Sequence, residues 1–166
     1  MFPDEINALA RDVLASARTG GIKIGTAESC TGGLVCGALT AIAGSSDVVE
    51  GGLVTYSYPA KQRLLGVAAN LLAREGAVSE PVARAMAEGA ITALKVDLSV
   101  AVTGVAGPSG GGPDKPVGLV HFATARKGGG VAHREERFGD LGRDGIRLAS
   151  VKVALSMLAE RLADDR

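Results

Sequence analysis

The chain lacks the features that mark several large classes of protein. Its 166 residues include two cysteines, two tyrosines, three phenylalanines and no tryptophan. Lysine plus arginine equals aspartate plus glutamate, at 18 each, and no stretch concentrates one sign of charge. Nucleic-acid binding proteins usually carry a basic face, so this balance argues against a nucleic-acid partner.

Further absences bear on membranes and cofactors. No apolar run approaches the ~20 residues of a membrane span, and the polar, acidic start Met1-Phe2-Pro3-Asp4-Glu5 is unlike a signal peptide. The spacing of Cys30 and Cys36 matches no zinc motif, so we expect free thiols and predict neither a metal nor another cofactor. We therefore expect a cytoplasmic protein with no membrane partner.

What the sequence does contain is small apolar residues and glycine. The apolar fraction is 46%, and because aromatics are scarce the core must be built from alanine, valine, leucine and isoleucine. The 24 glycines cluster, which marks places where the backbone turns sharply or approaches a ligand closely. The length suits a single domain, and we expect one domain over residues 1–166.

Hydrophobic periodicity predicts alternating helices and strands. Helices are expected at residues 3–18, 60–65, 79–95 and 143–162, and a further helix within the run 29–40. Strands are expected at 22–27, 53–57, 98–103, 117–125 and 131–138, with loops at 43–52 and 104–116. The last two strands form a hairpin through a glycine-rich turn. This order predicts an α/β fold, a three-layer α/β/α sandwich with a mixed, mostly parallel sheet.

The first candidate site is the run Thr26-Ala27-Glu28-Ser29-Cys30-Thr31-Gly32-Gly33, where a predicted strand passes into a helix. Backbone N–H groups at a helix start have no helical partner and carry positive potential. Such groups can hold a developing oxyanion while glycines keep side chains away. The alternative interpretation is that Ser29 or Thr31 only caps the helix.

A serine nucleophile needs a base, and neither histidine is a good candidate, because His121 and His133 fall in the predicted hairpin strands. Lysine is a known alternative base. In the run Tyr56-Ser57-Tyr58-Pro59-Ala60-Lys61, Tyr56 ends a predicted strand, Pro59 suits the first turn of the next helix, and Lys61 stands in that first turn. Lys61 would need its pKa lowered by about three units, or roughly 4 kcal/mol, which burial can supply. Tyr56 can then relay the proton or hold the amine. The alternative is a solvated lysine beside a strand-edge tyrosine.

The third element is the glycine-rich loop 104–116, which follows the most apolar predicted strand. Its backbone can cradle a phosphate or form a lid, although a plain mobile loop remains the alternative. It fits neither the Walker pattern nor the dinucleotide fingerprint. Arg143, near the start of the last predicted helix, can supply a positive charge for a phosphate.

Taken together, these motifs resemble the CinA C-terminal domain family of nicotinamide-nucleotide amidohydrolases. The resemblance runs from about residue 5 to 162 and rests on several ordered segments, namely residues 26–33, 42–46, 52–57, 76–82, 103–108 and 115–118, together with Lys61. The family's longer members carry an additional N-terminal domain, and we expect this chain to be the standalone form. One local departure is Tyr58, where the family often has asparagine.

The resemblance implies hydrolysis of the carboxamide of nicotinamide mononucleotide to nicotinate mononucleotide and ammonia. It implies Ser29 as nucleophile, Lys61 as base and Tyr56 as their helper. It also implies that three further residues line the substrate pocket: Ser46, Thr103 and Arg143.

The resulting hypothesis is a two-step acyl transfer without a metal. We expect the backbone of Cys30, Thr31, Gly32 and Gly33 to bind the substrate and hold the oxyanion. Arg143 and the loop that begins at Gly104, including Gly107, are expected to bind the ribose phosphate.

Three other interpretations stay open. Cys30 can be the nucleophile if a helix N-terminus lowers its pKa, although no histidine partner is visible. A dehydrogenase is less well supported, because Tyr56 and Lys61 are five residues apart and the nucleotide fingerprint is missing. A non-catalytic nucleotide-binding or interaction module linked to competence or DNA damage is the third. The apolar helices with small residues also favour a homo-oligomer, a dimer or larger.

Overall fold

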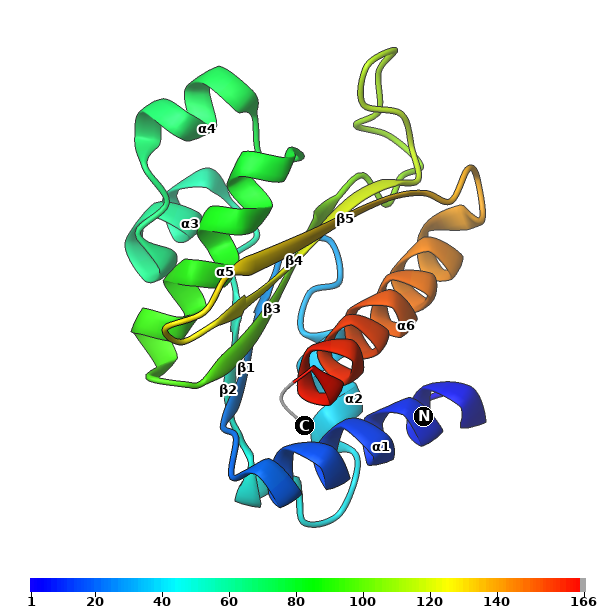
Figure 1. Cartoon of the computed structure of the whole chain (residues 1–166). Helices are drawn as coiled ribbons and strands as arrows, with labels where there is room; N and C mark the ends of the chain where they lie inside the picture. The colour runs from blue at the N-terminus through cyan, green and yellow to red at the C-terminus, as the bar shows by residue number, and fades with distance from the viewer. Residues whose placement is uncertain (165–166) are drawn as a thin grey trace.

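Six α-helices and five strands form along residues 1–164, which are the residues that this computed structural model describes (Figure 1). The helices are α1 (Asp4–Gly20), α2 (Leu34–Thr40), α3 (Tyr58–Leu65), α4 (Ala69–Glu75), α5 (Glu80–Leu94) and α6 (Gly142–Ala163). The strands are β1 (Ile24–Glu28), β2 (Val49–Val54), β3 (Leu98–Gly104), β4 (Leu119–Arg126) and β5 (Val131–Arg137). A single 3₁₀ turn, η1 (Ser45–Asp47), precedes β2.

The strands form one mixed sheet in the order β2-β1-β3-β4-β5. Strand β1 pairs in parallel with β2 and β3, whereas β4 is antiparallel to both β3 and β5. Helices α1, α2 and α6 cover one face of the sheet, and α3, α4 and α5 cover the other (Figure 1). The predicted α/β architecture with helices on both faces is confirmed.

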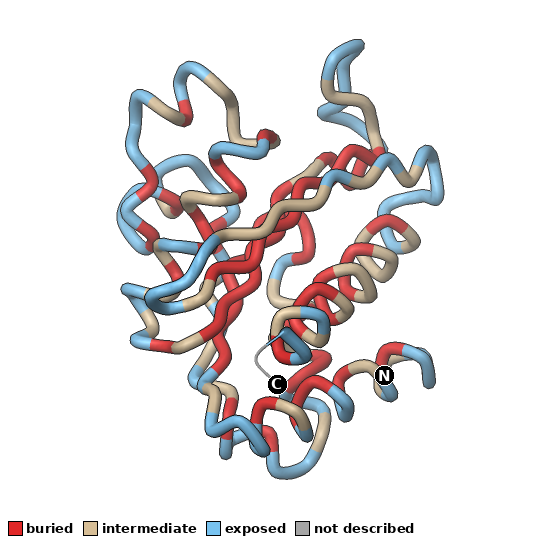
Figure 2. The backbone as a smooth tube through the Cα atoms, in the orientation of Figure 1, coloured by how far each residue is buried: buried red, intermediate tan, exposed pale blue. Residues whose placement is uncertain are grey.

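Two apolar clusters hold the layers together, one on each face of the sheet. Aliphatic side chains of α1, α2 and α6 pack on one face, and alanine-rich α5 packs on the alanines of β3 and β4 on the other. Every residue of β1 is buried, and so is nearly all of β3, as Figure 2 shows for the centre of the sheet. Small side chains therefore replace aromatic ones in this core, and they allow close approach between helix and sheet.

Two elements differ from the sequence-based expectation. Strand β2 covers Val49–Val54 rather than residues 53–57, and α4 was not predicted. Glycine is uncommon in strands, so Gly51 and Gly52 favoured a loop. A Cβ on Gly52 would lie 2.5 Å from the Thr26 hydroxyl and 2.7 Å from the Cys36 Cβ, so tertiary packing requires glycine at this strand position.

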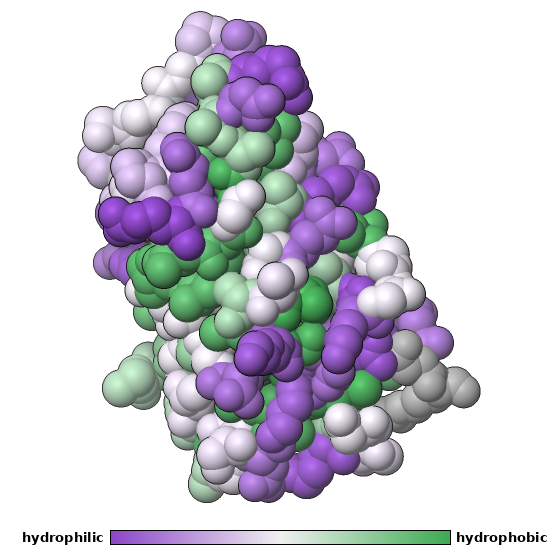
Figure 3. Space-filling view, turned by 90° about the vertical axis from the view of Figure 1, so that its left-hand side faces the viewer, coloured by the Kyte–Doolittle hydropathy of each residue, from purple (hydrophilic) through white to green (hydrophobic). Residues whose placement is uncertain are grey.

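The surface on the side of α3, α4 and α5 interleaves apolar with hydrophilic groups (Figure 3). Tyr58 and Leu64 of α3 are among its exposed large apolar side chains. Within residues 1–164 no helix combines the length and the hydrophobicity needed to cross a membrane.

Candidate active site

Ser29 lies directly beyond β1, at the carboxyl edge of the sheet. Its N–H donates to the carbonyl of Val102 in β3 at 2.9 Å, and the neighbouring Glu28 carbonyl accepts from the N–H of Thr55. Ser29 is therefore held between the ends of three parallel strands, where ligands of open α/β sheets usually bind. Its side chain is nearly buried, with 9% of the residue exposed.

A tight turn, rather than a helix, follows Ser29. Gly32 and Gly33 have φ values of +60° and +97°, which are left-handed conformations that favour glycine. Helix α2 begins only at Leu34. The helix expected within the run 29–40 is thus confirmed, and it occupies residues 34–40 because the chain first has to reverse from strand to helix.

The donors at the start of α2 are occupied, which changes the expected oxyanion site. The buried carboxylate of Glu28 accepts from the N–H groups of Gly33, Val35 and Cys36 at 2.8–3.0 Å. The N–H of Gly32 donates to the Ser29 carbonyl at 3.0 Å. The prediction that Gly32 and Gly33 hold an oxyanion is therefore contradicted, and of the four predicted donors only the N–H groups of Cys30 and Thr31 remain candidates.

Lys61 reaches Ser29 from the first turn of α3. The Ser57 hydroxyl caps this helix by accepting from the Ala60 N–H, and proline occupies its first turn, as predicted. A Cβ on Gly89 of α5 would overlap the Leu65 carbonyl, so glycine allows α3 to pack closely on α5. This packing brings Lys61 beneath the carboxyl edge of the sheet, where it is 0% exposed.

The Lys61 amine contacts three oxygens. Its Nζ lies 3.0 Å from Ser29 Oγ, 2.6 Å from the Thr55 carbonyl and 3.4 Å from the Tyr56 carbonyl. Burial lowers the pKa of Lys61 from 10.5 to about 8, although the nearby Cys30 acts in the opposite direction. At pH 7 roughly a tenth of the amine is then neutral.

This geometry suits a general base. A neutral amine has two N–H groups and one lone pair, and the two backbone carbonyls can accept both N–H groups. The lone pair is then left to accept the Ser29 hydroxyl proton. The arrangement lies within the reach required of a nucleophile and its base.

A cavity of about 210 Å³ opens beside Ser29. Its lining comes from the turn, the end of β2, the glycine-rich loop and α6: Ser29, Cys30, Tyr56, Gly104, Val105, Ala106, Gly107, Ser109, Gly110 and Arg143. Arg143 donates to the Gly107 carbonyl at 2.8 Å and to the Tyr56 hydroxyl at 3.4 Å. Tyr56 is 62% exposed. Its hydroxyl accepts from Arg143, whereas its backbone carbonyl is the atom that contacts the Lys61 amine.

Several predicted substrate-binding residues do not line this cavity. Ser46 lies in η1 at the opposite edge of the sheet, next to Asp47, whose carbonyl accepts from Lys23. The Thr103 hydroxyl is buried and donates to the Ala77 carbonyl, on the side of α5. Thr31, Gly32 and Gly33 shape the turn behind the cavity.

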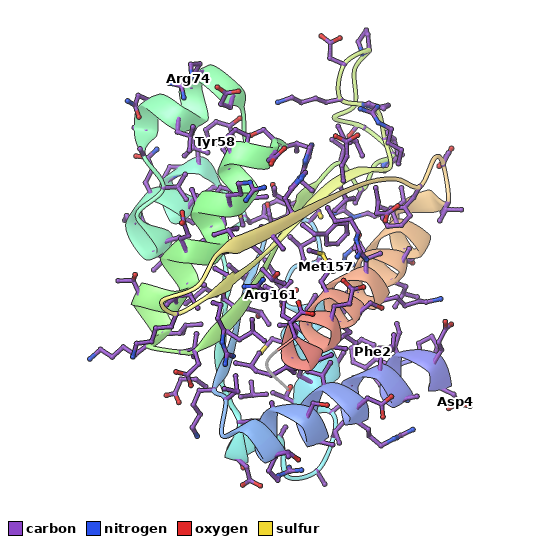
Figure 4. All side chains as sticks on the ribbon, in the orientation of Figure 1. Phe2, Asp4, Tyr58, Arg74, Met157 and Arg161 are labelled. Atoms are coloured by element: carbon purple, nitrogen blue, oxygen red, sulfur yellow. The ribbon has the colours of Figure 1, made fainter. Side chains whose placement is uncertain are left out.

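The family departure at Tyr58 is also explained by the structure. Tyr58 extends from α3 towards the connection between α4 and α5 (Figure 4), where its hydroxyl accepts from the Ala77 N–H at 3.0 Å. It braces that connection and is not part of the cavity wall.

The environment of Cys30 argues against a thiol nucleophile. The residue is 6% exposed, and burial raises the pKa of its thiol to about 12, with a smaller increase from the charge of Glu28. The N–H groups of Cys30 and Thr31 lower the pKa, but less than burial raises it. The alternative in which a helix start activates this cysteine is wrong, because burial raises the pKa of the thiol and Glu28 already accepts from N–H groups at the start of α2.

The two histidines pair with each other away from the cavity. His121 Nδ1 and His133 Nε2 are 2.9 Å apart, and burial lowers the pKa of both rings. Glu135 and Glu80 flank the pair at 3.9 and 3.5 Å. Neither histidine lines the cavity, which agrees with their rejection as the base. Within the described chain, no group of three metal-ligating side chains forms.

Sequence reasoning missed two charged residues beside the turn. Glu28 belongs to the motif at residues 26–33. Its position at a strand end did not indicate that its carboxylate accepts hydrogen bonds from the following helix. Arg147 follows Arg143 by one helical turn, and it donates to the carbonyls of Cys30 and Thr31 at 3.2 and 3.1 Å.

Fold and site together define a class of protein. It is an α/β/α protein in which a buried lysine amine is within hydrogen-bond distance of a serine hydroxyl at the carboxyl edge of the sheet. Comparison with known proteins gives the family. The chain belongs to the CinA C-terminal domain family, whose model matches residues 6–162.

Three relatives illustrate this membership. A CinA-like protein of Synechococcus sp. (strain RCC307) is 54% identical over 162 residues, which is 97% of this chain and 39% of that protein. The nicotinamide-nucleotide amidohydrolase PncC of Escherichia coli (strain K12) is 45% identical, and the match covers 95% of each protein. The crystal structure of competence/damage inducible protein CihA from Agrobacterium tumefaciens superposes with a TM-score of 0.95 at 52% identity and 98% coverage of both chains.

The coverage differs between these relatives. The chain spans 35–39% of the length of the CinA-like proteins that it matches, but nearly the whole of PncC.

Proposed function

We propose that this protein is an amidase that hydrolyses nicotinamide mononucleotide to nicotinate mononucleotide and ammonia. The observation that carries the proposal is the contact between the buried Lys61 amine and Ser29 Oγ, 3.0 Å apart at a cavity with an arginine on its far side. The 45% identity with an amidohydrolase of matching length supports the substrate.

In the proposed acylation step, Ser29 Oγ attacks the carboxamide carbon as its proton passes to Lys61 Nζ. The carbonyl oxygen becomes an oxyanion, and the N–H groups of Cys30 and Thr31 are the proposed donors to it. When the carbon–nitrogen bond breaks, the Lys61 ammonium returns the proton to the leaving nitrogen, which departs as ammonia.

In the proposed deacylation step, water attacks the ester carbon and Lys61 takes its proton. The ester bond then breaks, the Ser29 oxygen regains a proton, and nicotinate mononucleotide leaves. Burial of Lys61 supports both steps, because it keeps part of the amine neutral near pH 7. The charge of Arg143, with the backbone of Gly104 and Gly107, is the proposed phosphate site.

We further propose that residues 1–166 act as one amidohydrolase domain in the cytoplasm and need neither a metal nor another cofactor. The homo-oligomer expected from the sequence stays a prediction. The expectation that the protein binds neither nucleic acid nor a membrane also stays a prediction.

The test is an ammonia-release assay on the purified chain with nicotinamide mononucleotide. Turnover is expected for the wild type and should be lost in Ser29→Ala, while calorimetry still detects nucleotide binding. Full turnover in Ser29→Ala would exclude Ser29 as nucleophile. Binding without turnover in the wild type would favour the non-catalytic module.

A further inference from the structure

The turn that carries Ser29 is bound from one side by a single buried carboxylate. Glu28 is 0% exposed, and its two oxygens accept from the N–H groups of Gly33, Val35 and Cys36 and from the Thr26 hydroxyl. Burying a carboxylate is unfavourable unless its oxygens are hydrogen-bonded. These four bonds, together with the positive end of α2, compensate for that burial and tie Glu28 to the helix beyond the turn.

The same turn is also bound by a guanidinium. Helix α6 packs against α2 (Figure 1) and presents Arg147 to the carbonyls of Cys30 and Thr31. A Cβ on Gly32 would lie 3.3 Å from this guanidinium, which shows how closely Arg147 lies against the turn. Arg147 is not among the residues that line the cavity.

These two groups have a shared effect on the backbone next to Ser29. The Glu28 carboxylate accepts from N–H groups at the end of the turn that leads into α2. The Arg147 guanidinium donates to carbonyl groups at the end of the turn next to Ser29. Arg147 therefore fixes the planes of the Cys30–Thr31 and Thr31–Gly32 peptide groups, and the first of these carries the Thr31 N–H proposed for the oxyanion. The Cys30 N–H belongs to the Ser29–Cys30 peptide group, whose carbonyl accepts from the Gly32 N–H within the same turn. Rigid backbone at this point fixes the Ser29 Oγ relative to Lys61, which stands on α3.

We propose that Glu28 and Arg147 are positioning residues that hold Ser29 and its neighbouring N–H groups in reactive geometry without touching substrate. This inference rests on the proposed role of Ser29 as nucleophile. Misplacement by about 1 Å can lower a catalytic rate ~10²-fold. Loss of either residue should therefore reduce kcat and leave KM nearly unchanged, because neither side chain lines the cavity.

The experiment compares Arg147→Gln, Arg147→Lys, Arg147→Ala and Glu28→Gln in the whole chain. The matched control is Lys152→Gln, since Lys152 is also on α6 but pairs with Glu5 of α1. We expect Arg147→Gln and Glu28→Gln to lower kcat for nicotinamide mononucleotide ~10²-fold, with KM within about 3-fold. Arg147→Lys should restore part of kcat, and free guanidinium ion should restore part of it in Arg147→Ala. A residue that only stabilises the fold would change the unfolding temperature without these rescues.

A second readout, the rate at which a fluorophosphonate probe labels Ser29, needs no substrate. It should fall in Arg147→Gln and stay at the wild-type rate in Lys152→Gln. If Glu28→Gln does not fold, the Arg147 variants decide the question.

The outcomes separate this inference from the proposed function. Wild-type kcat and labelling rate in folded Arg147→Gln would overturn the inference and leave the proposed function intact. If the wild type labels but releases no ammonia, the proposed substrate is wrong, and the labelling rates still test the positioning. A wild type that neither labels nor turns over would overturn both.

Discussion

The two walls of the cavity differ in how firmly their polar groups are held. On the wall formed by Ser29, both the Ser29 side chain and the Lys61 amine that contacts it are buried and hydrogen-bonded within the protein. On the opposite wall, Tyr56 and Arg143 are exposed, and Arg143 contacts a loop carbonyl and a phenol.

The difference matches two separate tasks. Proton transfer needs a nucleophile and a base at fixed separation in a site that excludes water. Capture of a charged substrate needs exposed groups that can exchange their present partners for the ligand. The comparison predicts that substitutions on the buried wall reduce kcat, and that substitutions on the exposed wall raise KM.

The largest expected effect is on the buried wall. Lys61→Met keeps a side chain of similar length but removes the base, so ammonia release should fall at least ~10³-fold. Calorimetry should show that this variant still binds the nucleotide. Retention of more than a tenth of wild-type kcat in this variant would mean that another group takes the proton.

The same variant gives a stability test with a defined sign. The pKa of Lys61 is lowered in the folded protein, so the penalty for its burial is full below pH 8 and disappears as pH rises to 10.5. The fall in the pKa of Lys61 from 10.5 to about 8 corresponds to about 3 kcal/mol. The gain in unfolding free energy from Lys61→Met should therefore shrink by about that amount between pH 7 and pH 10.5, as measured by denaturant titration. A difference that does not vary with pH would contradict the lowered pKa.

The next effect concerns pH and rate. Because Lys61 must be neutral to act as a base, kcat/KM should fall about tenfold per pH unit below a midpoint near 8. Steady-state assays from pH 5.5 to pH 9.5 measure this profile. A rate that is constant down to pH 6 would exclude a lysine base, and Lys152→Met serves as the control.

On the exposed wall, Arg143→Gln should raise KM for nicotinamide mononucleotide ~10–100-fold and change kcat by less than about fivefold, because a charge-assisted contact to phosphate is lost. Nicotinamide riboside, which lacks the phosphate, should be affected much less by the same substitution. If kcat falls as strongly as in Lys61→Met, the two walls do not have separate tasks.

The smallest effect is expected at Cys30. With its thiol pKa raised to about 12, iodoacetamide should modify it slowly at pH 7.5, and Cys30→Ala should keep kcat within about tenfold of the wild type. The rate of alkylation, followed by mass spectrometry, checks the first point. Rapid alkylation with matching loss of activity would restore the thiol as nucleophile.

The sequence was informative wherever local pattern and tertiary packing agree. The apolar run of β3 and the proline at the start of α3 were both recognisable, and they place Thr103 and Lys61 close to their observed elements. Strand β2 was misplaced, because its glycines are explained by Thr26 and Cys36 on neighbouring elements.

The candidate site was predictable in part. Ser29 and Lys61 were found from a strand end and a helix start, which meet at the carboxyl edge of the parallel strands β1, β2 and β3. The roles of Glu28 and Arg147 depend on contacts across a turn and between helices, which no local pattern encodes. Ser46 entered through the family resemblance alone, and in this chain it lies at the far edge of the sheet.

The most direct test is the pKa of the Lys61 amine in the free protein. The chain has six lysines, so ¹³C-labelled lysine side chains can be followed by NMR as pH rises, and Lys61→Met identifies the signal that is lost. The account predicts a midpoint near pH 8 for that signal. A midpoint at pH 10 or above would show an amine charged throughout the neutral range and would contradict Lys61 as the base for Ser29.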